Sequence, residues 1–252
     1  MNCTNCDQGN PDHARFCQHC GRNLDATQTG EHTVVAPDTN NPSSDVPAQT
    51  PPAGNVDGIP CDQREHLVIV LDVSESMGER YDDRMNKLTA AQRAVVTLVV
   101  QKAQIDANDL VGLVAFNADA RIVLHPCPLA TNKRDIIAAV QSLEVGGGTD
   151  INKGLKAAGE AHSWHDPNVV RRIHLLTDGH GGHPLKTAND LKNRGVVIDV
   201  TGMGENPSDV DEKLLRQVAS VIQNEVRYRF VKDSATLVDD ASRVADKTAT
   251  AV

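Results

Sequence analysis

Aromatic side chains are scarce in this chain of 252 residues: one tryptophan, two tyrosines and three phenylalanines make up 2% of it. A hydrophobic core must therefore be built mainly from aliphatic side chains, and the hydrophobic fraction of 39% is enough for one. No apolar run approaches the ~20 residues that cross a bilayer. The N-terminus, MNCTNCDQGN, also lacks the basic start and the apolar stretch of a secretory signal. We therefore expect a cytoplasmic protein that does not contact a membrane.

Basic charge is also in short supply, because 25 Lys and Arg side chains stand against 34 Asp and Glu, for a net charge of −9. No segment carries a basic stripe that could neutralise phosphates, which argues against nucleic acid or an anionic membrane as the main partner. The glycine-rich GGGTD at 146–150 is not followed by the G-K-[ST] of a phosphate-binding loop, and it does not form G-x-G-x-x-G. We therefore do not expect nucleotide binding.

Four of the six cysteines form two C-x2-C pairs near the N-terminus: Cys3, Cys6, Cys17 and Cys20. In a chain without a visible secretory signal, this spacing predicts a tetrahedral Zn²⁺ site rather than disulfides. Residues 1–24 resemble the short zinc-ribbon modules at the ends of microbial proteins. They are too few to build a core, so the metal should supply the folding free energy. A redox pair or another thiophilic metal is the alternative, and the remaining Cys61 and Cys127 are expected to be inert.

Residues 25–60 have the composition of a linker. They hold half of the chain's twelve prolines, no lysine or arginine, and no apolar periodicity. Such a segment cannot offset its ordering entropy and is expected to be disordered. The chain is therefore predicted to consist of a zinc ribbon at 1–24, a disordered linker at 25–60 and a larger domain at 61–252.

In the larger domain, apolar runs alternate with amphipathic segments, the pattern of an α/β fold with a doubly wound parallel sheet. Strands are expected at 66–71, 111–116, 121–125, 173–177, 196–201 and 227–231. Helices are expected from about Met85 onward and at 132–143, 150–163, 184–194, 209–221 and 234–246. The short NADA connection at 117–120 predicts an antiparallel pair. The sheet should therefore be mostly parallel, with one antiparallel strand at its edge.

Hydroxyl and carboxylate side chains follow two of the predicted strands. Asp72, Ser74 and Ser76 come directly after the first strand, and Asp178 follows another in LLTDG. Thr149 lies after three glycines, which are expected to let its backbone approach the others. Because loops at the carboxyl ends of strands meet at one edge of an open α/β sheet, we expect these five residues to converge. Oxygen ligands of this kind suit Mg²⁺, with Mn²⁺ or Ca²⁺ as alternatives.

This set of residues resembles the metal-ion-dependent adhesion site of the von Willebrand factor A-type (VWA) domain. The resemblance runs from about Arg64 to the C-terminus and implies a Rossmann-like fold. It implies that the two serine hydroxyls bind the metal directly and that Thr149 does so in the ligand-competent state. The two aspartates are implied to act mostly through water. The resemblance further implies that an Asp or Glu from a partner protein completes the coordination of the metal.

The function that follows is a non-enzymatic, metal-dependent protein-interaction adaptor. Intracellular relatives often work with ring-shaped AAA+ ATPases, so the resemblance permits such a partner. One alternative is a nucleic-acid-binding or regulatory zinc-ribbon protein. Another is a Mg²⁺-dependent hydrolase, although aspartyl-phosphate phosphatases use D-x-D where this chain has Ser74. A scaffold with a vestigial metal site is the third.

Several residues near these motifs could have either a functional role or an ordinary structural one. His180 and His183 in DGHGGH are expected on the rim of the metal site, in a solvated loop, with pH tuning or a second metal as the alternative. Glu75 stands where many relatives have glycine, and its side chain is expected to face solvent. The residues near a predicted helix end are expected to form a surface cap or a packing anchor: His162, Trp164 and His165.

Overall fold

The computed structural model describes residues 64–164, 166 and 169–247. The zinc-ribbon cysteines, Cys61, His165 and the segment assigned as a linker lie outside the described residues. Among the residues that are described, no helix combines the length and the apolar character needed to cross a membrane.

A six-stranded sheet forms the centre of the domain, with the strand order β3-β2-β1-β4-β5-β8. Its strands are β1 (Glu65–Asp72), β2 (Leu110–Phe116), β3 (Ala120–Pro128), β4 (Val170–Thr177), β5 (Val196–Met203) and β8 (Tyr228–Val231). Neighbouring strands are parallel except β2 and β3, which are antiparallel. The predicted α/β fold, with one antiparallel strand at the edge of a mostly parallel sheet, is confirmed.

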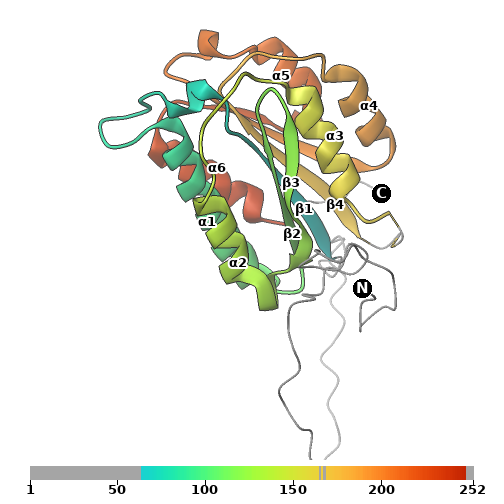
Figure 1. Cartoon of the computed structure of the whole chain (residues 1–252). Coiled ribbons are helices and arrows are strands. Elements are labelled where there is room, and N and C mark those ends of the chain that lie inside the picture. The colour runs from blue at the N-terminus through green and yellow to red at the C-terminus, as the bar shows by residue number, and fades with distance from the viewer. Residues whose placement is uncertain (1–63, 165, 167–168, 248–252) are drawn as a thin grey trace, which may run out of the picture.

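Helices cover both faces of this sheet (Figure 1). One face carries α1 (Lys87–Ile105), α2 (Leu129–Gln141) and α6 (Ser234–Ala245), and the other carries α3 (Ile151–Ala161), α4 (Leu185–Asn193) and α5 (Glu212–Val218). Strand β1 shows how the sequence produces two covered faces. Leu67 and Ile69 pack into the core beneath α1, whereas Val68 and Val70 pack into the core beneath α3. All eight residues of β1 are buried, as expected for a parallel strand covered on both sides.

Charged side chains are buried beneath α1 and α6, a feature that the sequence did not reveal. Arg172 on β4 is fully buried and bridges Glu65 on β1, at 3.0 Å, and Asp199 on β5, at 2.9 Å. Lys102 on α1 lies 3.0 Å from the buried carboxylate of Asp109 and also pairs with Glu65. A buried ion is costly unless it is paired. The network therefore ties three strands and α1 into one arrangement.

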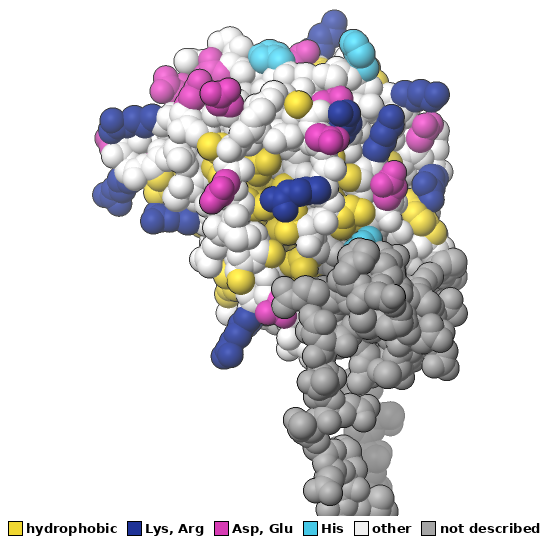
Figure 2. All heavy atoms as spheres, viewed as in Figure 1, with side chains coloured by type: hydrophobic (Ala, Val, Ile, Leu, Met, Phe, Trp, Pro, Cys, Tyr) yellow, Lys and Arg dark blue, Asp and Glu magenta, His cyan; other side chains and the backbone are white. Residues whose placement is uncertain are grey.

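Charges on the surface are mixed. On the face shown in Figure 2, Lys and Arg side chains of the described residues are interspersed with Asp and Glu. No continuous basic patch forms on that face among those residues, so it offers no stripe for a chain of phosphates.

One predicted helix is wrong over part of its length. Instead of a helix at 209–221, the chain forms a 3-10 turn, η2 (Pro207–Asp209), and then the short α5. A two-stranded hairpin follows, made of β6 (Val221–Ile222) and β7 (Glu225–Val226). Its two turn residues, Gln223 and Asn224, have φ values of 50° and 65°. Two-residue hairpin turns favour Asn-Gly or Asp-Gly, and Gln-Asn lacks that recognisable signal.

Candidate metal centre

The two aspartates lie at the point where the chain's connections leave the sheet in opposite directions. Asp72 is the last residue of β1, and Asp178 directly follows β4, its parallel neighbour. The chain continues from β1 toward β2 on one side, while β4 continues toward β5 on the other. Such a switch point leaves a crevice beyond the carboxyl ends of the strands, where ligands of α/β proteins bind.

Asp72 forms the buried base of this crevice. Its side chain is shielded from solvent, and one carboxylate oxygen, Oδ1, accepts a hydrogen bond from the backbone N–H of Ser74 at 2.9 Å. The other oxygen, Oδ2, accepts one from the hydroxyl of Thr177 at 2.6 Å. Burial raises the pKa of Asp72 to about 6, because a buried carboxylate loses hydration. A cation near Asp72 would supply the charge compensation that the two hydrogen bonds leave incomplete.

Three further oxygens lie next to one another above Asp72. Ser74 precedes the 3-10 turn η1 (Glu75–Gly78), which brings the hydroxyl of Ser76 to 3.2 Å from that of Ser74. The hydroxyl of Ser76 in turn donates to Oδ1 of Asp178 at 2.9 Å. Adjacent oxygens in an octahedron around Mg²⁺, at 2.0–2.1 Å from the metal, are separated by about 2.9 Å. The spacing of these three oxygens is therefore close to that of neighbouring ligands on one small cation.

The loop that carries Thr149 is clamped against the η1 turn. The N–H of Gly146 donates to the carbonyl of Val73 at 2.8 Å, and the N–H of Glu75 donates to the carbonyl of Gly147 at 2.9 Å. Gly147 has a φ of 78°, which favours glycine. A Cβ added at Gly146 would meet no atom within 4 Å. Of the three glycines expected to give the loop its freedom, Gly147 is thus the one whose backbone conformation requires it.

Thr149 faces the loop that follows β4. A Cβ at Gly179 would lie 3.5 Å from the Thr149 hydroxyl oxygen, and a Cβ at Gly181 would lie 2.3 Å from the Thr149 carbonyl oxygen. The glycines of DGHGGH therefore let this loop pack against Thr149, rather than serving only as a flexible rim. This contact brings Thr149 to the same crevice as Asp178.

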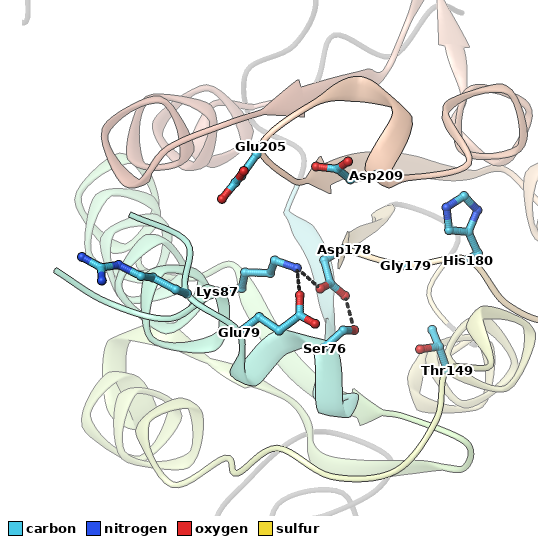
Figure 3. Close-up of a pocket in the computed structure, with 10 residues that line it drawn as sticks. Ser76, Glu79, Lys87, Thr149, Asp178, Gly179, His180, Glu205 and Asp209 are labelled. Carbon is cyan, nitrogen blue, oxygen red and sulfur yellow. Dashed lines mark hydrogen bonds and ion pairs between the residues drawn. The ribbon is translucent and has the colours of Figure 1, made fainter. Parts of the chain in front are cut away.

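A buried lysine that belongs to none of the sequence motifs pairs with Asp178. The ammonium of Lys87, the first residue of α1, lies 2.8 Å from Oδ2 of Asp178 and 2.9 Å from Oε2 of Glu79 (Figure 3). Burial, the largest influence, lowers the pKa of Lys87, but its hydrogen bonds and charge attraction to Asp178 and Glu79 raise the pKa above its ordinary value. The ammonium is therefore a fixed positive charge beside the candidate metal ligands.

These groups open into one surface pocket of about 550 Å³. Its lining consists of Ser76, Glu79, Arg80, Lys87, Thr149, Asp178, Gly179, His180, Glu205 and Asp209. Asp72 and Ser74 are buried and do not line it. His180 is exposed at the rim as predicted, whereas His183 is exposed but is not part of the lining.

The donor chemistry fits a hard cation. Among the described residues, no group of three or more His, Cys, Asp and Glu could hold a metal ion, so no soft or imidazole-rich site is formed by them. The candidate set instead combines two carboxylates with three hydroxyls, all of them oxygen donors. Mg²⁺, Mn²⁺ and Ca²⁺ prefer such ligands. Asp72, Ser74, Ser76, Thr149 and Asp178 would hold the cation.

The chain matches the family profile of the von Willebrand factor type A domain over residues 67–180. That range begins in β1 and ends just after Asp178. Residues 67–180 are a von Willebrand factor type A domain. In this VWA domain, β1 and the β1–α1 connection provide one part of the candidate site and the end of β4 provides another.

Known proteins have similar sequences or similar folds. The chain is 27% identical over 183 residues to calcium-activated chloride channel regulator 1 of Bos taurus, a match that covers 72% of this chain and 19% of the relative. The structure of a von Willebrand factor type A protein from Catenulispora acidiphila superimposes with a TM-score of 0.58 at 24% identity, covering 73% of this chain and 42% of the other. Proximal thread matrix protein 1 from the mussel byssus, in a structure described as having a zinc-occupied MIDAS motif, gives a TM-score of 0.58 at 22% identity, with 74% and 48% covered. The chain spans between 19% and 37% of the length of the curated relatives it matches.

The cysteine, glutamate and histidine outside the pocket have the structural roles expected from the sequence. Cys127 is a free, buried thiol whose pKa is raised to about 12 by burial. The side chain of Glu75 is exposed, as expected. His162 is buried and meets the ring of Trp164 edge-on at 5.9 Å, while the guanidinium of Arg194 lies 3.3 Å above that ring. These contacts make the segment a packing anchor.

Proposed function

We propose that this protein is a divalent-cation-dependent protein-binding adaptor. Its VWA domain holds Mg²⁺ through Asp72, Ser74, Ser76, Thr149 and Asp178, with Mn²⁺ or Ca²⁺ as substitutes. An Asp or Glu side chain of a partner protein enters the pocket and completes the coordination of the metal.

The observation that carries this proposal is the spacing of the oxygens of Ser74, Ser76 and Asp178, at 3.2 and 2.9 Å, beside the pocket that Thr149 lines. Neutral hydroxyls leave a bound cation with much of its positive charge. A cation in this condition, close to the surface, attracts a carboxylate. Water-filled coordination positions are usual for protein-bound Mg²⁺, and an incoming carboxylate would replace one such water.

Binding is supported better than hydrolysis by the hydrogen bonds of the two aspartates. Hydrolysis at a metal needs a base or nucleophile that is free to act beside it. Both oxygens of Asp72 accept hydrogen bonds from Ser74 and Thr177, and both oxygens of Asp178 accept them from Ser76 and Lys87. The VWA domain is accordingly proposed as a binding module without catalytic activity.

The test combines metal binding with partner capture, using the full chain. Calorimetric titration with Mg²⁺ or Mn²⁺ should show one site that is lost in Asp72→Ala and weakened in Thr149→Ala. Thr131→Ala, an exposed threonine on α2, serves as the matched control. Chelators would also strip zinc, so the variants replace them.

Partner capture from a lysate of the source organism, at one fixed Mg²⁺ concentration, then compares wild type, Thr131→Ala and Thr149→Ala. Partners retained by wild type and Thr131→Ala but not by Thr149→Ala would support the proposal. The same set on all three proteins would contradict it.

The N-terminal zinc ribbon also stays a proposal, with Zn²⁺ held by Cys3, Cys6, Cys17 and Cys20. One equivalent of zinc per chain, lost in Cys17→Ser, would support it, and a metal-free full-length protein would contradict it. Recruitment of an AAA+ ATPase rests on the family resemblance alone and would be read from the identities of the captured partners.

A further inference from the structure

The buried ammonium of Lys87 is unusual for a site that is meant to bind a cation. The side chain of Lys87 is 11% exposed, and its partner Asp178 is 0% exposed. Lysine is rarely buried unless it is paired. Its Nζ contacts the same carboxylate that would serve the metal, and it lines the pocket in which a ligand would bind.

The position of Lys87 in the fold keeps this charge in place. Lys87 begins α1, and its backbone N–H donates to the carbonyl of Glu79 at 3.0 Å, so the start of the helix is tied to the η1 turn. The second partner of the ammonium, Oε2 of Glu79, belongs to a side chain that is 67% exposed. Water screens Glu79 strongly, whereas Asp178 and Lys87 interact with little screening.

The ammonium of Lys87 changes the total charge of the buried groups around a bound cation. A divalent cation together with the two buried carboxylates, Asp72 and Asp178, is neutral. The ammonium of Lys87 adds one positive charge, so the buried groups of the loaded site together carry a net positive charge. The other charged side chains that line the pocket are exposed and are therefore screened by water: Glu79, Arg80, Glu205 and Asp209. The ammonium repels the incoming metal ion and attracts an incoming anion, because both interactions depend on the same charge.

We propose that Lys87 is a specificity-determining residue of this site: its ammonium weakens the binding of the divalent cation and strengthens the binding of the partner's carboxylate. This inference rests on the proposed function. Removing the charge should move the two affinities in opposite directions. A lysine that only positioned Asp178 would behave differently, since its loss would weaken both.

The experiment uses the full chain, loaded with zinc, and Mn²⁺ as the metal probe. Calorimetry gives the Mn²⁺ affinity, and titration of acetate into the Mn²⁺-loaded protein, followed by water-proton relaxation, gives the carboxylate affinity. Asp72→Ala is the blank for metal bound elsewhere. Lys87→Met is expected to bind Mn²⁺ more tightly, on the order of tenfold, and acetate more weakly by a similar factor.

Two controls define the role of the charge. Lys87→Arg keeps the charge and should stay near wild type in both measurements. Lys133→Met makes the same change in net charge at an exposed position on α2 and should change neither affinity.

A second variant tests the same charge if Lys87→Met does not fold. Glu79→Gln removes the exposed carboxylate that pairs with the ammonium of Lys87, so the ammonium is less neutralised. Mn²⁺ binding should become weaker and acetate binding stronger, each by roughly two- to threefold.

The outcomes separate this inference from the proposed function. Unchanged affinities, or a loss of both, in Lys87→Met or Glu79→Gln would overturn the role of Lys87 while leaving the metal site in place. A wild-type protein that binds no Mn²⁺ above the Asp72→Ala blank would overturn both proposals.

Discussion

Gly181→Ala is predicted to damage the proposed metal site with little damage to the rest of the fold. A Cβ at this position would lie 2.3 Å from the carbonyl oxygen of Thr149. An ordinary contact between carbon and oxygen is about 3.3–3.6 Å, so the two loops must separate by about 1 Å. The distance between a metal ion and its ligand can depart from the ideal value by only about 0.2 Å. A shift of about 1 Å between Thr149 and Asp178 therefore exceeds that tolerance several-fold.

The expected cost differs between stability and metal binding. Inserting a methyl group into a packed contact usually costs about 1–3 kcal/mol, and here the contact joins two loops at the edge of the domain. We therefore expect the free energy of unfolding in urea to fall by about 1–2 kcal/mol without metal. Calorimetry should show the Mg²⁺ affinity falling by at least about tenfold, which is about 1.4 kcal/mol.

Two other glycines provide matched controls. Gly146→Ala lies in the Thr149 loop, but its Cβ would meet no atom within 4 Å, so both quantities should stay near wild type. Gly195→Ala lies after α4 at a φ of 80°, so it should cost about 1–2 kcal/mol of stability and leave Mg²⁺ binding unchanged. If Gly181→Ala bound Mg²⁺ like wild type, or Gly146→Ala lost as much affinity, the packing of the two loops would not control the site.

Three further predictions concern the core. Arg172→Met removes the buried cation that Glu65 and Asp199 share, so the free energy of unfolding in urea should fall by about 3–5 kcal/mol, the usual cost of breaking a buried ion pair. A loss below about 1 kcal/mol would contradict the importance of the network. Burial lowers the pKa of His174 from 6.5 to about 4, so the folded state holds this ring neutral at a pH where the unfolded chain already protonates it. The stability that the neutral ring allows is therefore fully present above pH 6.5 and is lost as the pH falls toward 4. The difference in unfolding free energy between wild type and His174→Asn should therefore change by about 3 kcal/mol against wild type from pH 7 to pH 4, and a pH-independent difference would refute this. The thiol of Cys127 is buried and has a raised pKa, so it should react with a disulfide reagent only as fast as the domain opens. Mass spectrometry of the labelled peptide follows this reaction. Rapid labelling of the native protein would show that the thiol is accessible.

The sequence was informative where the signal is local. Asp72, Ser74 and Ser76 lie within five residues, so the turn after β1 brings them together once the strand is recognised. The alternation of apolar runs and helices was equally direct, and the short turn at 117–120 correctly predicted the antiparallel strand. Patterns of this kind depend on neighbours along the chain, which the sequence displays.

The contacts that local sequence patterns do not show join residues far apart in the chain. In the sequence, Lys87 shows only the pattern of the first helix, yet its ammonium reaches Asp178, 91 positions away. Arg172 precedes the apolar run that was used to place a strand, so β4 was predicted to start at Ile173 rather than at Val170. A charged side chain normally indicates a surface, and only the fold shows that Glu65 and Asp199 neutralise this one in the interior.

The use of hydroxyls in place of carboxylates links the fold of this site to its proposed role. Ser74 is 1% exposed, so an aspartate there would place a third negative charge beside Asp72 and Asp178, both of which are also buried. Three carboxylates would more than neutralise a divalent cation, and the bound metal would no longer attract an anion. With serine at this position, and with the ammonium of Lys87 against Asp178, a bound divalent cation would keep a positive charge that faces the pocket. In the proposed metal site, the protein would therefore give up tight cation binding so that the loaded surface can bind an acidic side chain.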